Sequence, residues 1–379
     1  MVRTDRLTRA LRDMKGRVAE KVTHDFFERH PQWKEQYGQA GYEHGLRDAA
    51  FHVDFLAGAA EARDPEAFAE YARWAAGVLE ARGIGRTFLE ENLIQVRDAV
   101  LEELSGGPEP DLLREIADAG IAAVREEGPG SPVARPTLEP SDEPLEALQA
   151  DSLDRVARAY LGAILSGSRN AATGIMDRAM ESGTSVPDLY IHVIQRAQHA
   201  LGDLWAANRI SVAQEHMASA VTQSVLAHLY PHLPDPAELR GPAVVTGVAG
   251  ENHQIGAHMV ADVLEAEGWS VRFLGSDVPH SAVVSTVESE KPQLVGISVT
   301  MLFNLGAAAE LIQAVRDAGA EWAPTILTGG RAFHLSANAW REVGADVWAP
   351  DLAAVRELAS TLGPGVTGSG SPDGGPPAL

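Results

Sequence analysis

Residues 243–256 read AVVTGVAGENHQIG, an apolar run followed by a turn and the start of a helical pattern. Four more apolar runs alternate with helical patterns downstream, at residues 270–275, 293–300, 324–329 and 345–350. Such alternation is typical of an α/β domain with a doubly wound parallel sheet, Rossmann or flavodoxin-like, which we expect over residues 241–362. Ligands of these sheets bind beyond the carboxyl ends of the strands. His253 lies just past the first strand, where small residues are usual, and therefore points to a specific ligand.

Composition narrows the function classes. Hydrophobic residues make up 45% of the 379 residues, enough for two or three domains with cores of their own. No run approaches the roughly 20 apolar residues of a membrane span, and the charged N-terminal sequence has no apolar signal core. We therefore expect a cytoplasmic protein that contacts no membrane. The formal charge of −22 opposes binding to nucleic acid. Because the chain has no cysteine, any cofactor is held non-covalently or through other side chains.

The chain is predicted to have three structured segments. Residues 1–126 show apolar residues at helical spacing and predict an all-α domain of five or more helices. Residues 127–144, rich in proline, serine and acid, are typical of a linker. Residues 145–235 contain four helical patterns and predict a four-helix bundle. The Gly- and Pro-rich residues 363–379 predict a disordered tail.

Helix-start signals support these assignments. Asp64 precedes a proline that suits the first position of a helix. Thr87 with Glu90, and Ser211 with Gln214, have the spacing of capping boxes.

Three short sequence elements at fixed separations suggest which ligand His253 binds. The turn ENHQIG ends at residue 256, the triplet SVT follows after 41 residues, and the pair GG follows after a further 28. These separations resemble those of cobalamin-binding domains, in which D-x-H-x-x-G, S-x-L and G-G lie about 41 and about 26 to 28 residues apart. Here glutamate stands in place of the aspartate and threonine in place of the leucine. The elements contribute Glu251, His253, Gly256, Ser298, Thr300, Gly329 and Gly330.

The resemblance implies a role for each of these residues. His253 would coordinate cobalt from below through an imidazole nitrogen, in place of the corrinoid's own base. Glu251 would accept the other ring N–H and fix the tautomer. The glycines would leave room for the displaced nucleotide tail, and Ser298 would hydrogen-bond to it. The change to Thr300 affects only the packing of the tail.

The predicted bundle carries a second motif, in which Trp205 is followed after nine residues by Glu215-His216. Ahead of an E-x-H-x-x-G domain, this pattern resembles the adenosylcobalamin-dependent photoreceptors of the CarH type, whose bundle caps the upper corrin face. The resemblance implies that Trp205 lies over the 5′-deoxyadenosyl group and that Glu215 and His216 contact it. Alternatively, Trp205 is part of the bundle core and Glu215-His216 is an exposed pair on a helix.

One position departs from the light-sensing repressors of that type. In those proteins a histidine directly after the tryptophan ligates cobalt once light has removed the adenosyl group, whereas this chain has Ala206. His192, His199 or water could take that place. The repressors also begin with a winged-helix DNA reader. Residues 1–126 contain no recognition helix with clustered Arg and Lys, so DNA binding is not expected.

An all-helical domain ahead of such a module resembles the layout of the photocobilins, which hold biliverdin beside cobalamin with a globin-like sensor domain. This implies a second, non-covalent chromophore within residues 1–126. Side chains that could stack on a planar tetrapyrrole or pair with its propionates are Trp33, Tyr37, Tyr42, His44, Arg47 and His52. The alternatives are that these aromatic residues form the core, or that the domain holds haem.

The leading hypothesis is therefore a photoreceptor and not an enzyme. Light would break the cobalt–carbon bond and change the conformation or assembly of a homo-oligomer, which signals to an unknown protein effector. Two alternatives remain: a corrinoid protein that carries a methyl group for a methyltransferase, and a light-independent cobalamin or redox sensor. No motif places a nucleophile or an acid–base pair, so catalysis by this chain alone is not expected.

Overall fold

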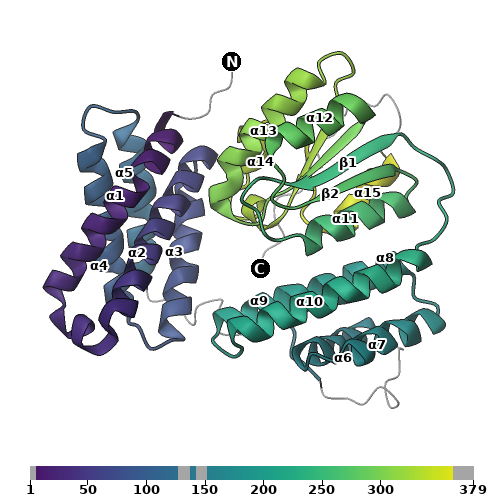
Figure 1. Cartoon of the computed structure of the whole chain (residues 1–379), viewed down its shortest axis with the longest axis horizontal. Helices are drawn as coiled ribbons and strands as arrows, with labels where there is room; N and C mark the ends of the chain where they lie inside the picture. The colour runs from purple at the N-terminus through teal and green to yellow at the C-terminus, as the bar shows by residue number, and fades with distance from the viewer. Residues whose placement is uncertain (1–5, 127–136, 142–151, 362–379) are drawn as a thin grey trace.

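The computed structural model of the chain describes residues 6–126, 137–141 and 152–361. The elements form three groups: a helical domain at the N-terminus, a helical bundle, and a sheet covered by helices (Figure 1). The predicted tail and most of the predicted linker lie outside the described residues. Among the described residues, no helix is long and apolar enough to cross a membrane.

Five helices make up the N-terminal domain: α1 (Arg6–Arg29), α2 (Pro31–Ala62), α3 (Pro65–Glu80), α4 (Arg86–Glu103) and α5 (Pro110–Arg125). Gly38, with a φ of 57°, interrupts α2. The side chain of Asp64 caps α3 as predicted, by accepting a hydrogen bond from the Glu66 amide. The capping box predicted at Thr87 is wrong, because the N-cap of α4 is the extended Gly85, two residues earlier, which leaves Thr87 inside the first turn. The all-helical prediction is confirmed, and the likeness to a globin stays a prediction.

The bundle contains the four predicted helical segments. They comprise α6 (Leu153–Leu165), α7 (Arg169–Glu181), a third segment made of α8 (Val186–Leu189), a π-helical turn η3 (Tyr190–Ile194) and α9 (Gln195–Ala206), and α10 (Val212–Leu229) with a final 3₁₀ turn η4 (Tyr230–His232). The capping box at Ser211 and Gln214 is present, with hydrogen bonds in both directions. The bundle fold predicted from the sequence is confirmed.

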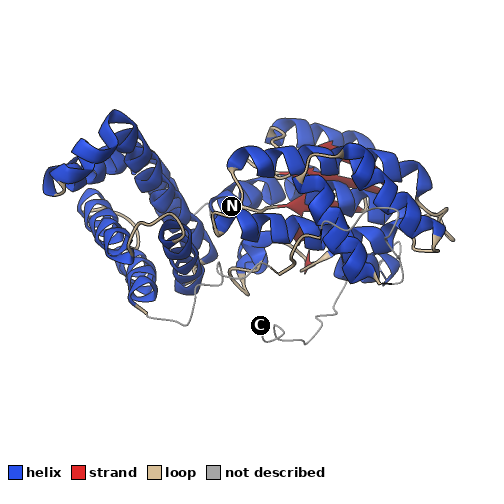
Figure 2. Ribbon diagram, turned by 90° about the horizontal axis from the view of Figure 1, so that it is seen from below, coloured by secondary structure: helices blue, strands red, loops and turns tan. Residues whose placement is uncertain are grey.

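The third group is a five-stranded parallel sheet in the order β2-β1-β3-β4-β5. Its strands are β1 (Pro242–Gly247), β2 (Ser270–Gly275), β3 (Leu294–Ser298), β4 (Thr325–Gly329) and β5 (Val347–Trp348). Its helices are α11 (Ile255–Ala266), α12 (His280–Glu290), η5 (Leu302–Asn304), α13 (Leu305–Ala318), η6 (Arg331–Phe333), α14 (Ala339–Glu342) and α15 (Leu352–Thr361). Helices lie on both faces of the strands (Figure 2), so the doubly wound prediction is confirmed.

Two hydrophobic cores join the three groups. The N-terminal helices share one core with α12 and α13, which cover one face of the sheet. The bundle shares the other core with α11 and α15, on the opposite face. Burial of apolar side chains is the main stabilising contribution to such contacts. The sheet domain is therefore held between the N-terminal helices and the bundle.

Candidate functional site

The carboxyl ends of three neighbouring strands meet at one edge of the sheet. Ser298, at the end of β3, pairs with Gly247 of β1 on one side and with Gly329 of β4 on the other. The chain leaves β1 toward α11 on one face and leaves β3 toward α13 on the opposite face. In doubly wound folds this switch in direction creates the crevice in which ligands bind. The loop of His253 follows β1 directly and therefore lies at this crevice.

His253 is held by the buried carboxylate of Glu251. The Nδ1 atom of His253 lies 2.6 Å from Oε1 of Glu251, and the backbone N–H of His253 donates to the same oxygen at 3.1 Å. Burial by itself raises the pKa of Glu251, but the hydrogen bonds from His253 outweigh it and lower the pKa to about 2. An ionised carboxylate only accepts, so the ring donates from Nδ1. The lone pair of a neutral imidazole is then on Nε2, the atom that faces away from Glu251.

The second oxygen of Glu251 is bound by the segment that follows β3. Oε2 accepts hydrogen bonds from the backbone amides of Thr300 at 2.8 Å and Met301 at 3.1 Å, and from the side-chain amide of Asn304 at 3.1 Å. The side chain of Glu251 is fully buried, and a buried charge requires such partners. One carboxylate thus connects the histidine loop with the loop after β3.

The ring of His253 is open toward the bundle. Its side chain is 57% exposed, and Nε2 has no hydrogen-bond partner among the described residues. The hydrogen bond with Glu251 raises the pKa of His253, and the negative charge of Glu215 on α10 adds to the effect. Helix α10, which carries Glu215, contacts α11, which starts two residues after His253, so the structure brings the elements of the two sequence motifs together.

The predicted pair on α10 is itself hydrogen-bonded. The Nδ1 atom of His216 lies 2.6 Å from Oε2 of Glu215, whose other oxygen accepts from the Ser219 hydroxyl at 3.0 Å. The side chain of His216 is 74% exposed. The pair therefore forms a polar, solvent-accessible surface on α10, and its contact with a ligand stays a prediction.

Trp205, at the end of α9, is contacted by the N-terminal domain. Its ring centroid lies 6.3 Å from that of Trp74 on α3, with 27° between the planes. The guanidinium of Arg82, just after α3, lies 5.1 Å from the Trp205 ring and donates to the carbonyls of Trp205 and Ala206 at 3.1 Å. Trp205 remains partly exposed and is thus not simply part of the bundle core.

The predicted glycines differ in how much space a side chain would have at each position. Gly330 has a φ of 103°, and a Cβ there would collide with the carbonyl oxygen of Val299. A Cβ at Gly329 would only contact the Ala349 oxygen, and one at Gly256 would meet open space. Gly330 is therefore required by the backbone itself, whereas the space at Gly256 is available to a ligand.

The residues suggested for a bilin fall into two groups. Trp33, Tyr37 and Tyr42 lie at the interrupted start of α2, where the ring of Trp33 is 5.2 Å from that of Tyr37 and also packs on Phe26 and Phe88. Tyr37 is 44% exposed. The remaining three are His44 and Arg47, which are exposed, and His52, which is buried.

His52 has a buried partner in the N-terminal core. Its Nδ1 atom lies 2.7 Å from the hydroxyl of Tyr71. Desolvation lowers the pKa of His52 to about 4, so the ring is neutral near pH 7. His52 is thus a core residue of α2, apart from the aromatic group at its start.

The structure also bears on the residues considered for the position of Ala206. Ala206 is buried. His192 lines a groove with Glu267 and Arg356, next to the far end of α11. Because α11 starts beside His253 and its 12 residues span about 18 Å, His192 is not brought to the site. His199 on α9 is exposed.

Three residues at the site were missed by sequence reasoning. Asn304 donates to Glu251 across 53 positions of the chain. Trp74 and Arg82 reach Trp205 from more than 120 positions away. Trp74 has the helical spacing of a core residue, and Asn304 follows Ser298 in a loop, so neither has a local signal that would have distinguished it.

Comparisons with known proteins match the two regions that form this site. Residues 241–358 match the family described as B12 binding domain, and residues 156–230 match a second family with the same description. The two regions are B12-binding domains. They indicate a cobalamin or another corrinoid as the cofactor, and we refer to residues 156–358 as the cobalamin module.

Individual relatives align with part of this chain. A corrinoid protein of Desulfitobacterium hafniense is 22% identical over 205 residues, which cover 53% of this chain and 94% of that protein. The HTH-type transcriptional repressor CarA of Myxococcus xanthus is 32% identical over 124 residues, 32% of this chain and 41% of the repressor. The structure of the monomethylamine corrinoid protein of Methanosarcina barkeri covers 55% of this chain and 99% of that one, with a TM-score of 0.50 and 21% identity, and shows the same fold.

The residues present fit a corrinoid. A single imidazole with its Nδ1 fixed by a buried carboxylate offers Nε2 to a metal, and neutral imidazole suits a borderline ion such as cobalt. The open space at Gly256 lies in the first turn of α11, directly after the loop of His253. The chain thus supplies one nitrogen donor for a metal beside open space.

Proposed function

We propose that this protein is a cytoplasmic light sensor that binds adenosylcobalamin between the bundle and the sheet domain. Adenosylcobalamin would supply a cobalt–carbon bond that visible light breaks. His253 would hold the cobalt from below, and Glu251 would orient its ring. Gly256, Ser298, Thr300, Gly329 and Gly330 would surround the nucleotide tail, and Trp205, Glu215 and His216 would face the adenosyl group. The resulting change would alter self-association and signal to a protein effector.

The observation that carries this proposal is the contact of the N-terminal domain with Trp205. Trp74 and Arg82 hold Trp205, the residue that in this proposal faces the adenosyl group. A group packed against Trp205 therefore influences how the N-terminal domain sits on the bundle. A change in the site shifts a conformational equilibrium by the difference in its interaction free energy between the two states. This arrangement suits a sensor whose output domain is α1–α5.

We further propose biliverdin as a second, non-covalent chromophore of the N-terminal domain. The aromatic group at the start of α2 supports this proposal, since Trp33 and Tyr37 offer partly exposed ring faces beside the interruption at Gly38. Exposed His44 and Arg47 on the same helix could pair with propionates. His52, which is buried against Tyr71, would act only by packing.

The test is an absorption spectrum of the full chain produced with cobalamin and biliverdin available, in the dark and after illumination. We expect the bands of adenosylcobalamin in the dark and a lasting change after green or blue light. Size-exclusion chromatography with light scattering on the same samples should show a change in mass. A dark spectrum that is unaffected by light would contradict the sensor proposal, and equal masses after confirmed photolysis would contradict the change in assembly.

The second candidate is a corrinoid protein that carries a methyl group for a methyltransferase. It is favoured by the relative named a corrinoid protein, which aligns with this chain over 94% of its own length. A carrier has to present its cobalt to partner enzymes, so it would bind methylcobalamin and transfer the methyl group when a partner is added. Stable methylcobalamin in the purified protein, without any response to light, would favour this function.

A further inference from the structure

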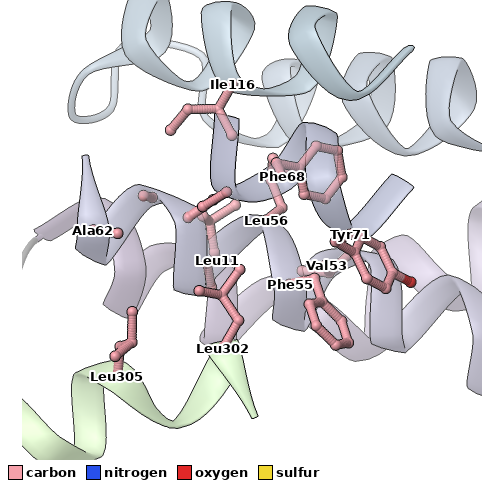
Figure 3. Close-up of a cluster of buried hydrophobic side chains, with 14 of the residues drawn as sticks. Leu11, Val53, Phe55, Leu56, Ala62, Phe68, Tyr71, Ile116, Leu302 and Leu305 are labelled. Atoms are coloured by element: carbon pink, nitrogen blue, oxygen red, sulfur yellow. The ribbon is translucent and has the colours of Figure 1, made fainter. Parts of the chain in front are cut away.

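The segment 300–304, which follows β3 and ends in η5, lies between Glu251 and the N-terminal domain. On one side, the amides of Thr300 and Met301 and the side chain of Asn304 bind the Glu251 carboxylate. On the other side, Leu302 is fully buried in the core shared with the N-terminal helices. Figure 3 shows Leu302 and Leu305 reaching from the sheet domain among side chains of the N-terminal helices, which include Leu11 and Phe55.

Helix α2 approaches the backbone of this segment closely at Gly58. A Cβ at Gly58 would lie 2.5 Å from the backbone oxygen of Leu302 and 2.6 Å from its carbonyl carbon. Such distances do not occur between real atoms, so α2 and the backbone of Leu302 are in direct contact and only glycine permits it. Because the contacted atoms are backbone, a shift of α2 at this point moves the segment itself.

Aromatic packing fixes the segment from the same direction. The ring of Phe303 lies edge-on to that of Phe55 on α2, with 5.4 Å between the centroids. Phe55 in turn stacks on Tyr71 of α3 at 3.7 Å and 10°. The segment is therefore packed against two helices of the N-terminal domain, and well-packed contacts of this kind transmit displacements.

The position of the segment affects His253, because no other group among the described residues hydrogen-bonds to Oε2 of Glu251. If the amides of Thr300 and Met301 withdraw, the buried carboxylate loses charge-assisted hydrogen bonds and must move to regain partners. Its other oxygen holds Nδ1 of His253. The outer partners of a metal-binding histidine set its orientation and basicity, so their displacement weakens the metal bond.

We propose that the N-terminal domain sets the strength with which His253 binds cobalt, by pressing at Gly58 on the segment 300–304, which supports Glu251. This inference rests on the proposal that His253 is the lower ligand of a bound cobalamin. Gly58, Phe55 and Phe303 are positioning residues in this scheme. The N-terminal domain is then part of the tuning of the cobalt site and not only a neighbour.

The test compares Gly58→Ala with two matched glycine-to-alanine controls in the full chain. A Cβ at Gly16 on α1 meets open space, and one at Gly306 meets only the flexible end of Arg12 at the same interface. The probe is hydroxocobalamin, reduced to the Co(II) form for electron paramagnetic resonance of protein produced with ¹⁵N-labelled histidine, whose splitting differs from that of the corrinoid's own base. We expect Gly58→Ala to reduce the signal with nitrogen splitting from the axial imidazole and to weaken binding about tenfold. Both controls should match the unaltered protein.

A second measurement does not depend on how the variants fold. Because coupling is reciprocal, hydroxocobalamin should slow amide hydrogen exchange around residues 55–60 of α2 in the unaltered chain. His253→Ala, which still permits the corrinoid to occupy the cleft, should lose most of this protection. Equal exchange with and without the corrinoid would overturn the inference.

The outcomes separate this inference from the proposed function. If His253→Ala leaves the ¹⁵N splitting unchanged, His253 is not the lower ligand and both proposals fail. If His253→Ala removes the splitting while Gly58→Ala behaves like Gly16→Ala, the ligand assignment stands and the coupling is overturned. Loss of splitting in Gly58→Ala together with protection of α2 by the corrinoid would support the coupling.

Discussion

The rings of Trp74 and Trp205 lie 6.3 Å apart and nearly parallel, although they belong to the N-terminal domain and to the bundle. We expect Trp74→Ala to release Trp205 and to weaken adenosylcobalamin about fivefold, since a pair of aromatic rings contributes about 1 kcal/mol. Hydroxocobalamin should be affected less, because it presents no adenosyl group to the indole. Titration of both corrinoids, followed by absorbance, measures the difference. Trp340→Ala is the control, since this residue also packs against an arginine but on α14. Equal losses for both corrinoids would contradict the prediction.

Glu251→Gln should weaken corrinoid binding about 10- to 100-fold. A neutral amide cannot accept from His253 on one atom and from the amides of Thr300 and Met301 on the other, because its nitrogen is a donor. The binding of hydroxocobalamin, measured by titration, checks this. The control is Glu290→Gln, which removes a carboxylate that pairs with Arg272 at the surface. If Glu251→Gln and the control bind hydroxocobalamin with comparable affinity, Glu251 has no role in the site.

The buried His52 should make the N-terminal domain sensitive to acid. Its pKa is lowered to about 4, whereas an unfolded histidine titrates near 6.5. Between pH 4 and pH 6.5 the unfolded state binds a proton that the folded state does not. The contribution of neutral His52 to the free energy of unfolding is therefore complete above pH 6.5 and is lost as the pH falls toward 4. Between pH 7 and pH 4.5 we expect a loss of about 2 kcal/mol that is absent in His52→Gln. Urea unfolding followed by circular dichroism measures it, with His24→Gln as the exposed control. The same pH dependence in both variants would contradict this role.

Asp262 should have the opposite dependence on pH. Burial raises its pKa to about 6, although the hydroxyl of Tyr190 donates to it at 2.7 Å. Between about pH 4 and pH 6 the folded state therefore holds a proton that the unfolded state has lost. The contribution of protonated Asp262 to the free energy of unfolding is complete below about pH 4 and is lost as the pH rises through 6. From pH 5 to pH 8 we expect a loss of about 1 kcal/mol that Asp262→Asn removes. Thermal unfolding of both proteins in matched buffers checks it, and parallel curves would contradict it.

Much of the sheet domain was predictable because its signals are local. The three central strands are buried on both faces and appear as continuous apolar runs. All five strands were located from residues 243–350. The Ser211 cap was predictable because both partners lie within one turn. The start of α4 was not, because Gly85 adopts an extended conformation that a side-chain pattern does not report.

The candidate site was predictable only in part. His253 and Glu251 lie two residues apart, and the motif alone predicted their hydrogen bond. The support of Glu251 by Asn304 depends on two strands being neighbours in the sheet, and no spacing in the sequence indicates which side chain of a loop turns toward a given carboxylate.

The sequence by itself determined the elements, the absence of thiol chemistry, and the histidine, serine and glycines that lie at the ends of the strands. Only the tertiary structure decided that α2 presses on Leu302 and that α3 reaches Trp205. The physical reason is that hydrophobic burial has no direction: an apolar stripe on a helix requires a partner surface but does not specify which one. The choice of partner depends on shape, here on a glycine at residue 58 that permits backbone contact.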